Sequence, residues 1–230
     1  MSDLTYSIVL PLYRQESHID DLVNQYVEGL ESQSHSWEII LVVNGNKDEC
    51  FARAVSHAKR DERIIALELK EGGWGKAVKY GMAAAKGKLL CYTNSARTQI
   101  SDLLLILNYA RVNTEAVVKA SRIVRASLAR KIGSVLYNFQ NRILFQTAIM
   151  DVNGTPKVFP RKVWETLNIY SDEDLIDAEA VAKCFRKGIP IVEVPVRITN
   201  RRGGASTTRL SSAFKMYAGL VSLYRKLSNE

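Results

Sequence analysis

An alternation of apolar, strand-like runs with helix-compatible segments constrains the fold of this chain more than any other feature. Residues 6–12 read YSIVLPL and residues 37–45 read WEIILVVNG, and about two dozen helix-compatible residues separate them. A proline closes the first run, and an Asn-Gly turn signal closes the second. Two such runs with a helix between them predict a β-α-β unit, in which the two strands are parallel.

The same alternation continues along the rest of the chain. We predict helices at 51–61, 75–87, 101–111, 127–146, from about residue 174, and at 210–227, and strands at 63–70, 88–93, 116–121, 155–160 and 189–198. The pattern predicts an α/β fold with a mostly parallel sheet and helices on both of its faces, a single-domain three-layer α/β/α arrangement.

Length and composition agree with one domain. The 230 residues are 47% hydrophobic, which is enough for one substantial core. We expect a catalytic-type domain over 1–208 and a C-terminal basic amphipathic helix of the same domain over 209–230. No window approaches the ~20 apolar residues of a membrane span, and the start lacks the basic region of a signal peptide. We therefore expect a cytoplasmic protein.

The net charge of +8 predicts an anionic partner, and the distribution of charge locates it. From Lys119 to Arg142 there are six basic residues and no acid, and from Lys183 to Lys226 there are ten basic residues and one acid. These basic residues are not interleaved with an aromatic platform, so no nucleic acid is expected. The expected anionic partner is therefore a phosphate-bearing ligand or an anionic membrane surface.

Parallel sheets bind ligands beyond the carboxyl ends of their strands. Four segments follow strands in the first half of the chain and are expected to converge on one crevice: 13–16, 43–48, 70–76 and 93–98. Asn94 and Arg97 lie in the last of these segments.

Five segments in chain order resemble one enzyme family. They are SIVLPLYRQESHI (7–19), EIILVVNGNKDE (38–49), GGWGKAVKYGMAAAKGKLL (72–90), DVNGTPKVFPR (151–161) and DAEAVAKCFRKGIPIVEVPVRITNRRGGAST (177–207). Together they are similar to the family-2 inverting glycosyltransferases, and within them to the dolichyl-phosphate mannose synthase group. The resemblance covers roughly residues 6–208 and implies the nucleotide-sugar-binding fold of that family, which is Rossmann-like and of the GT-A type.

The resemblance implies a hexosyl transfer from a UDP- or GDP-linked sugar to a polyprenyl phosphate or a saccharide, with inversion. It assigns donor binding to Pro11, Tyr13, Glu16, Asn44, Lys76, Asn94 and Ser95. It assigns the acceptor or its phosphate to Arg122, Arg130, Arg201, Arg202 and Ser206. Asp151 and Asp177 are the candidate catalytic residues on the acceptor side. Asp177 and Glu179 lie two apart on a predicted helix and cannot both face the site, and one of these two would act as general base if the acceptor is a sugar hydroxyl. If the acceptor is a lipid phosphate, the nucleophile is already anionic and no base is required.

The chain departs from the family pattern at the donor site. The Asp-x-Asp motif falls on Asn94-Ser95-Ala96, and the base-binding aspartate of the second strand falls on Val43. A divalent Mg or Mn ion prefers hard anionic oxygens, and an amide, a hydroxyl and a methyl group supply few of them. No metal ligand is therefore predicted with these residues.

Two explanations of this departure remain open. Cationic side chains such as Arg97 could replace the metal by stabilising the charge on the departing diphosphate. Alternatively, the chain is a non-catalytic glycosyltransferase-like binding or scaffold subunit. We expect an active enzyme, because the segments on the acceptor side remain intact.

The C-terminal helix carries Arg209, Lys215, Arg225 and Lys226 beside an apolar stripe. This pattern fits an interfacial helix at an anionic membrane. It fits equally a helix packed on the core with a basic outer face. We expect peripheral association with the cytoplasmic leaflet.

Overall fold

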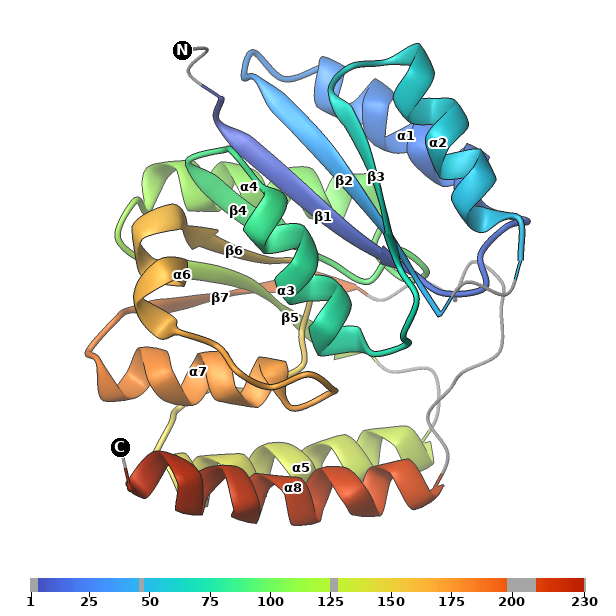
Figure 1. Ribbon diagram of the computed structural model, residues 1–230. Helices are drawn as coiled ribbons and strands as arrows, with labels where there is room; N and C mark the ends of the chain where they lie inside the picture. Colours follow the sequence, from blue (N-terminus) through green and yellow to red (C-terminus); the bar gives the residue numbers. More distant parts are fainter. Residues whose placement is uncertain (1–3, 46–47, 125–127, 198–209, 230) are drawn as a thin grey trace.

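The computed structural model describes residues 4–45, 48–124, 128–197 and 210–229, with the backbone alone at 124, 128–132 and 210–214 (Figure 1). The strands are β1 Tyr6–Leu12, β2 Trp37–Asn44, β3 Ile64–Leu69, β4 Leu89–Tyr92, β5 Val117–Val124, β6 Lys157–Pro160 and β7 Ile191–Arg197. The helices are α1 Ile19–Glu31, α2 Cys50–Arg60, α3 Trp74–Ala84, α4 Ile100–Val112, α5 Leu128–Phe145, α6 Arg161–Leu167, α7 Ile176–Arg186 and α8 Leu210–Ser228. Among these residues, no helix combines the length and apolar character that a bilayer crossing needs.

The strands form one seven-stranded sheet in the order β3-β2-β1-β4-β6-β5-β7. Strands β1, β2, β3 and β4 pair in parallel, and β5 pairs in parallel with β7. Strand β6 is antiparallel to both of its neighbours, β4 and β5. The predicted α/β class and mostly parallel sheet are confirmed.

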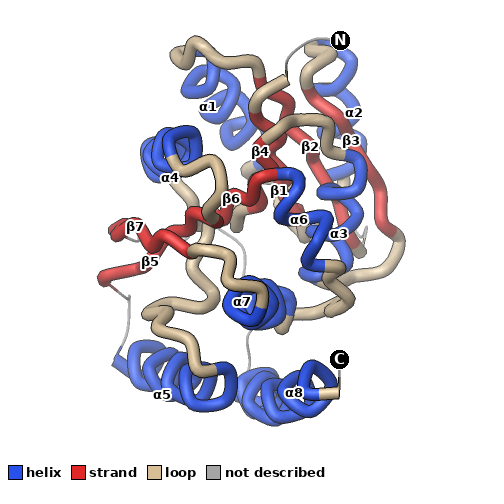
Figure 2. Tube along the Cα trace, turned by 90° about the vertical axis from the view of Figure 1, so that its left-hand side faces the viewer, coloured by secondary structure: helices blue, strands red, loops and turns tan. Residues whose placement is uncertain are grey.

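Helices cover both faces of the sheet, as Figure 2 shows end-on. Helices α1, α2 and α4 pack on one face through a cluster that includes Tyr26, Ala54 and Leu107. Helices α3, α6 and α7 pack on the other face through a second cluster. Strands β1 and β2 are buried along their whole length, which is why both read as continuous apolar runs rather than alternating ones.

Helices α5 and α8 form a further layer on the outer side of α7 (Figure 1). They run in the same direction, because Tyr137 contacts Tyr217 and Phe145 contacts Tyr224. Hydrogen bonds join the two helices, from the Tyr217 hydroxyl to the Gly133 carbonyl at 2.6 Å and from the Gln140 amide to the Tyr217 carbonyl at 3.1 Å. The three expected layers are therefore extended by this pair.

Two local expectations differ from the structure. Helix α7 begins at Ile176 and not near residue 174, and residues 171–173 before it run across the start of α3, where the Asp172 carbonyl accepts the Lys76 amide at 2.9 Å. Helix α6 was not predicted from the sequence, because its seven residues are too few to show a helical period.

Candidate glycosyl-transfer site

The segments predicted to line the crevice meet where β1, β2 and β4 end. The Ser95 hydroxyl lies 3.1 Å from both the Pro11 carbonyl and the Gln15 side-chain oxygen, which ties the loop after β4 to the end of β1. The Glu16 carboxylate accepts the backbone amide of Glu49 at 3.0 Å, which ties the loop after β1 to the start of α2. Segments far apart in the sequence thus meet at the carboxyl ends of the strands.

Asn44 joins the same edge to the start of α3. Its side-chain nitrogen donates to the Leu12 carbonyl at 3.0 Å, and its oxygen accepts the Gly73 amide at 3.4 Å. Gly75 is needed where the chain passes residues 171–173, since an added Cβ would lie 2.7 Å from the Ser171 carbonyl oxygen. These contacts hold the first turn of α3 over the crevice.

Lys76 lies on that first turn and is half-buried. Its ammonium forms an ion pair with Glu71, and this partner raises the pKa of Lys76. The cation is therefore charged at the start of α3. On the loop after β1, Tyr13 is half-buried and Arg14 is exposed.

The residues at the Asp-x-Asp position supply few ligand atoms for a metal ion. Asn94 is half-buried, and its side-chain oxygen accepts the backbone amide of Ala96 at 3.1 Å. Ser95 and Ala96 are only 2% and 3% exposed, and Val43 is buried at the end of β2. Within the part of the chain that the structure describes, no three His, Cys, Asp or Glu side chains come together as metal ligands would. These residues do not fit a divalent ion.

Arg97 lies three residues beyond Asn94 in the same loop. Its backbone amide donates to the Asn94 carbonyl at 3.0 Å, and the residue is half-buried. The loop therefore brings one cation to the edge where the family motif would bring two carboxylates.

The expected acceptor side centres on Arg122 and Asp151. The guanidinium of Arg122 contacts both carboxylate oxygens of Asp151, at 2.6 Å from Nε and 2.8 Å from Nη2, and the Arg122 amide donates to the same group at 3.0 Å. Burial alone would lower the pKa of Arg122, but the Asp151 carboxylate outweighs burial, and the pKa is raised. Asp151 is 3% exposed, so this pair is a fixed part of the site.

Lys119 and Glu193 hold the Asp151 backbone from two sides. The Lys119 ammonium donates to the Asp151 carbonyl at 2.5 Å and to Glu193 at 3.0 Å. Glu193 in turn accepts the backbone amides of Met150 and Asp151 at 2.7 and 3.1 Å. Lys119 is completely buried, and burial lowers its pKa while Glu193 opposes that shift.

A further buried ion pair lies between the sheet and α7. Asp177 on α7 accepts the Lys157 ammonium at 2.5 Å and the Tyr92 hydroxyl at 2.7 Å. Burial lowers the pKa of Lys157 to about 8, although Asp177 opposes the change. Glu179 faces elsewhere, accepting the amides of Tyr170 and Ser171 and pairing with Lys183, as expected for residues two apart on a helix.

Sequence reasoning missed Lys119, Lys157 and Glu193. Each is a charged residue inside an apolar strand, and that was the available signal. Lys119 and Lys157 are direct partners in the β5–β6 register. Each forms an ion pair with its own carboxylate, and these two ion pairs offset the repulsion between the ammonium groups.

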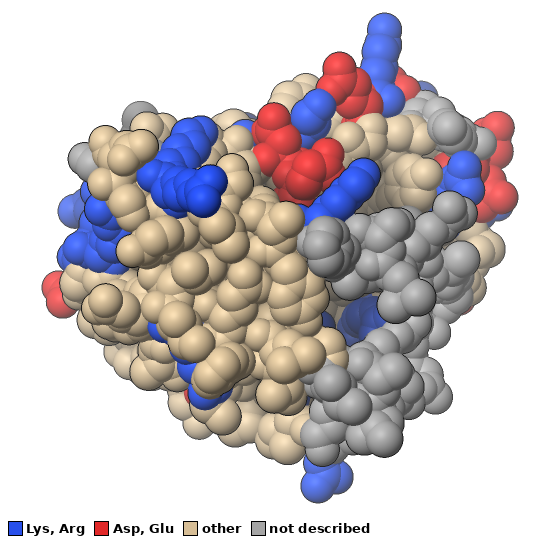
Figure 3. Space-filling view, turned by 90° about the horizontal axis from the view of Figure 1, so that it is seen from below, with Lys and Arg blue, Asp and Glu red and all other residues tan. Residues whose placement is uncertain are grey.

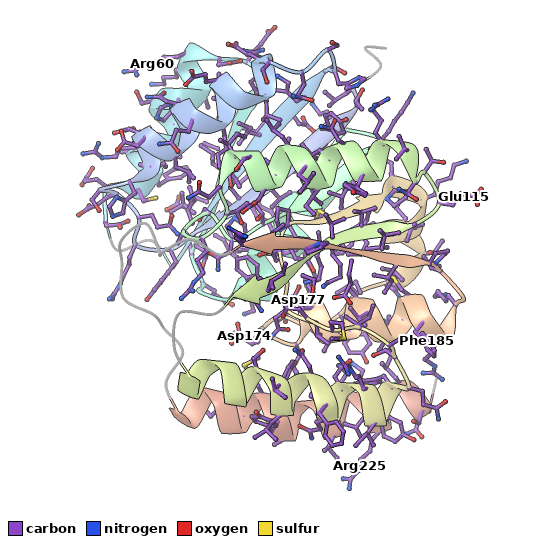
Figure 4. All side chains as sticks on the ribbon, turned by 180° about the vertical axis from the view of Figure 1, so that it is seen from behind. Arg60, Glu115, Asp174, Asp177, Phe185 and Arg225 are labelled. Carbon is purple, nitrogen blue, oxygen red and sulfur yellow. The ribbon has the colours of Figure 1, made fainter. Side chains whose placement is uncertain are left out.

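Asp174 is a further carboxylate near Asp177. Figure 4 shows both residues at the amino end of α7, between the sheet and the α5–α8 pair. The residue is exposed at the surface, yet desolvation of its carboxyl, and then the charge of Asp177, raise the pKa of Asp174.

The remaining predicted acceptor residues are only partly placed. Arg130 lies at the start of α5, where the structure describes the backbone alone. Arg201, Arg202 and Ser206 lie outside the described residues.

The model of glycosyl transferase family 2 matches residues 7–167. A dolichyl-phosphate beta-glucosyltransferase of Trichomonas vaginalis is 26% identical over 235 residues, covering 94% of this chain and 71% of that protein. A dolichyl-phosphate beta-glucosyltransferase of Drosophila melanogaster is 24% identical, covering 89% of this chain and 70% of that protein.

Solved structures agree on the fold. Glucosyl-3-phosphoglycerate synthase from Mycobacterium tuberculosis, crystallised with Mn²⁺, UDP and glucosyl-3-phosphoglycerate, matches with a TM-score of 0.72 at 15% identity. The match covers 96% of this chain and 78% of that one. The family match spans the crevice, the Asn94 loop and the Arg122–Asp151 pair, and the chain therefore belongs to glycosyl transferase family 2 and is a glycosyltransferase.

Proposed function

We propose that this enzyme transfers a sugar from a UDP- or GDP-linked donor to a polyprenyl phosphate, with inversion at the anomeric carbon. The observation that carries the proposal is that the candidate catalytic carboxylates, Asp151 and Asp177, are each ion-paired to a cation of the protein. Protein donors already occupy both oxygens of Asp151 and Oδ1 of Asp177, so neither carboxylate is free to reach the proton of an acceptor hydroxyl. A hydroxyl acceptor needs a base, whereas an ionised phosphate does not. The names of the two dolichyl-phosphate relatives favour the same class of acceptor.

In the proposed reaction a phosphate oxygen of the acceptor attacks the anomeric carbon. The bond from that carbon to the donor diphosphate breaks, and the nucleoside diphosphate leaves with the electron pair. Arg122, held rigidly by Asp151, orients the acceptor phosphate. The proposal places the donor over β1, β2 and β4, beside Tyr13, Asn44 and Asn94.

Cations, in this proposal, stabilise the departing diphosphate. Arg97 lies on the loop after β4 and Lys76 on the first turn of α3, and Arg202 lies on the segment that resembles the phosphate-facing loop of the family. Positive side chains aimed at developing negative charge can supply much of the rate enhancement of a transferase. Since the residues at the Asp-x-Asp position do not fit a divalent ion, no step is assigned to one.

Titration calorimetry with a panel of UDP- and GDP-sugars tests the donor site directly. We expect at least one donor to bind, with the same affinity in magnesium, manganese and chelator. Binding that requires the metal would overturn the role given to cations. If no donor binds under any condition, the chain is a scaffold or binding subunit, and the transferase proposal fails.

Arginine variants test the cation mechanism. Replacing Arg97 or Arg202 by alanine should weaken donor affinity about 10- to 100-fold, the effect of one charged hydrogen bond to phosphate. The exposed Arg60 on α2 is the matched control, and Arg60→Ala should leave affinity unchanged. Wild-type affinity in both test variants would remove this mechanism.

We also propose that the enzyme works at the cytoplasmic leaflet as a peripheral protein. A polyprenyl phosphate acceptor is held in a membrane by its chain, and the basic half of this protein is attracted to anionic lipid.

A further inference from the structure

Helix α5 exposes apolar residues on its outer face in addition to those that it buries. Val135, Leu136, Phe139 and Ile143 lie at helical spacing and are 53–62% exposed. On the inner face, Tyr137 and Phe145 pack in the core, and the buried Asn138 donates to the Met150 carbonyl at 2.8 Å. A helix on a water-exposed surface normally presents polar side chains to the solvent, so the outer face of α5 is unusual.

Met150 extends this face beyond the end of the helix. It is 62% exposed, and the Arg142 guanidinium contacts its sulfur at 2.8 Å, which holds it beside the last turns of α5. We call Val135, Leu136, Phe139, Ile143 and Met150 the α5 stripe.

The two helices on this side of the molecule carry a single sign of charge. The sequence has no acid between Glu115 and Asp151 or between Glu193 and Glu230, so α5 and α8 contain none. Lys215, Arg225 and Lys226 are exposed on α8. Figure 3 views the molecule from the side of these helices and shows a broad area without charge, with Lys and Arg around it and most of the acids in view at its upper edge.

We propose that the α5 stripe docks the enzyme on an anionic lipid bilayer. An apolar face on a pair of helices that carry cations and no acids complements a bilayer surface, where apolar side chains enter the acyl boundary and cations meet lipid phosphates. The structure assigns the apolar contact to α5, whereas the sequence pointed to the C-terminal helix. In α8 the large apolar residues Leu220, Leu223 and Leu227 are buried against α5 and α7.

The surface lies on the same side of the molecule as the site proposed for the acceptor. Asp151 follows Met150 directly, and its partner Arg122 lies near the end of β5, shortly before α5 begins. Docking through the stripe would therefore bring the Arg122–Asp151 pair toward the membrane. Membrane docking would serve the proposed transfer to a polyprenyl phosphate, and in that sense the inference rests on the proposed function. The test of docking itself needs neither the donor nor the acceptor.

Vesicle flotation of the full chain tests the surface. We expect the protein to float with phosphatidylcholine vesicles containing about 30% phosphatidylglycerol, and much less with phosphatidylcholine alone or in high salt. Combining Phe139→Ser with Ile143→Ser should lower partitioning at least about tenfold. The matched control combines Tyr109→Ser with Val112→Ser, which removes exposed apolar residues from α4 on the other face of the sheet, and it should float like the wild type.

A second measurement does not depend on loss of function. Phe139→Trp should give a blue shift of fluorescence on addition of anionic vesicles, beyond the signal of the wild type. Circular dichroism establishes that each variant is folded.

Three results would overturn the proposal: a wild type that does not float, a stripe variant that floats as well as the control, or a wild-type dimer that the stripe variant dissociates. The last result would mean that a second copy covers this face. Donor calorimetry on the same samples separates the docking proposal from the proposed function. Loss of flotation with intact donor binding contradicts docking alone, and flotation without donor binding contradicts the transferase proposal alone.

Discussion

Charged side chains in the interior determine how the acceptor side is built. Lys119, Lys157 and Arg122 face Glu193, Asp177 and Asp151, so three buried cations are matched by three carboxylates. Removing one partner from such a pair leaves an uncompensated buried charge, which costs more than the pair itself contributes. The pairs therefore act as positioning devices, and their value lies in the fixed placement of Arg122.

Lys119→Met should destabilise the protein by up to about 3 kcal/mol, because the half-buried Glu193 then loses its cation. Urea unfolding measures the loss. The KM for acceptor should rise more than kcat falls, since the Asp151 loop is displaced but the donor edge is not. Adding Glu193→Gln should restore part of the stability. A Lys119→Met protein as stable as the wild type would contradict the role of this pair.

Asp174→Asn tests whether Asp174, the further carboxylate near Asp177, acts as a base for a hydroxyl acceptor. If the acceptor is a polyprenyl phosphate, initial rates should stay within about threefold of wild type, because no proton is removed. If a hydroxyl attacks and Asp174 is the base, the rate should fall about 10²- to 10⁴-fold. Asp177→Asn is the comparison, and it should lower stability through Lys157 whichever acceptor is used.

At the scale of elements, the donor edge depends on how closely α3 approaches the segment before α7. Gly75 permits this approach, since an added Cβ would lie 2.7 Å from backbone atoms of Ser171 and Asp172. Backbone cannot move aside as the end of a flexible side chain can. The position of Lys76 therefore follows from a glycine one residue before it.

Gly75→Ala should lower the free energy of unfolding by about 1–3 kcal/mol through overpacking, and should weaken donor binding by moving the start of α3. Chemical denaturation and donor calorimetry measure the two effects. Gly133→Ala in α5 is the control, because nothing lies within 4 Å of an added Cβ there. The control should be unchanged or up to about 1 kcal/mol more stable. Equal behaviour of the two variants would rule out the close approach.

For the whole molecule, the buried lysine beneath the sheet links stability to pH. The pKa of Lys157 is about 8 in the folded protein and 10.5 for an ordinary lysine. Between these values the unfolded chain binds more protons than the folded one, so this group makes the free energy of unfolding rise with pH.

From pH 7.5 to 9.5 the free energy of unfolding of the wild type should therefore rise by about 1–2 kcal/mol relative to that of Lys157→Met. Denaturation of both proteins across this range measures the shift. Lys162→Met is the control, since Lys162 is exposed on α6, and its difference from wild type should stay constant. The same pH slope in wild type and Lys157→Met would contradict the assignment.

Much of the fold was determined by the sequence alone. The period of apolar residues is a local property, and it predicted the parallel sheet of the first half and most element bounds within a few residues. The convergence of the strand ends followed from the parallel order. The same local signal predicted the helices α5 and α8, because the spacing of apolar and basic residues along a helix can be read from consecutive residues.

Only the tertiary structure decided the partners and directions. Strand β6 is antiparallel although its residues resemble those of the other strands, because direction depends on the path of the chain and not on the strand itself. Lys119 meets a carboxylate 74 positions away, and Lys157 meets one 20 positions away. Packing likewise decided which apolar residues of α5 are buried. Tyr137 and Phe145 contact α8, whereas Phe139 and Ile143 are exposed, since a periodic pattern defines a face but not what covers it.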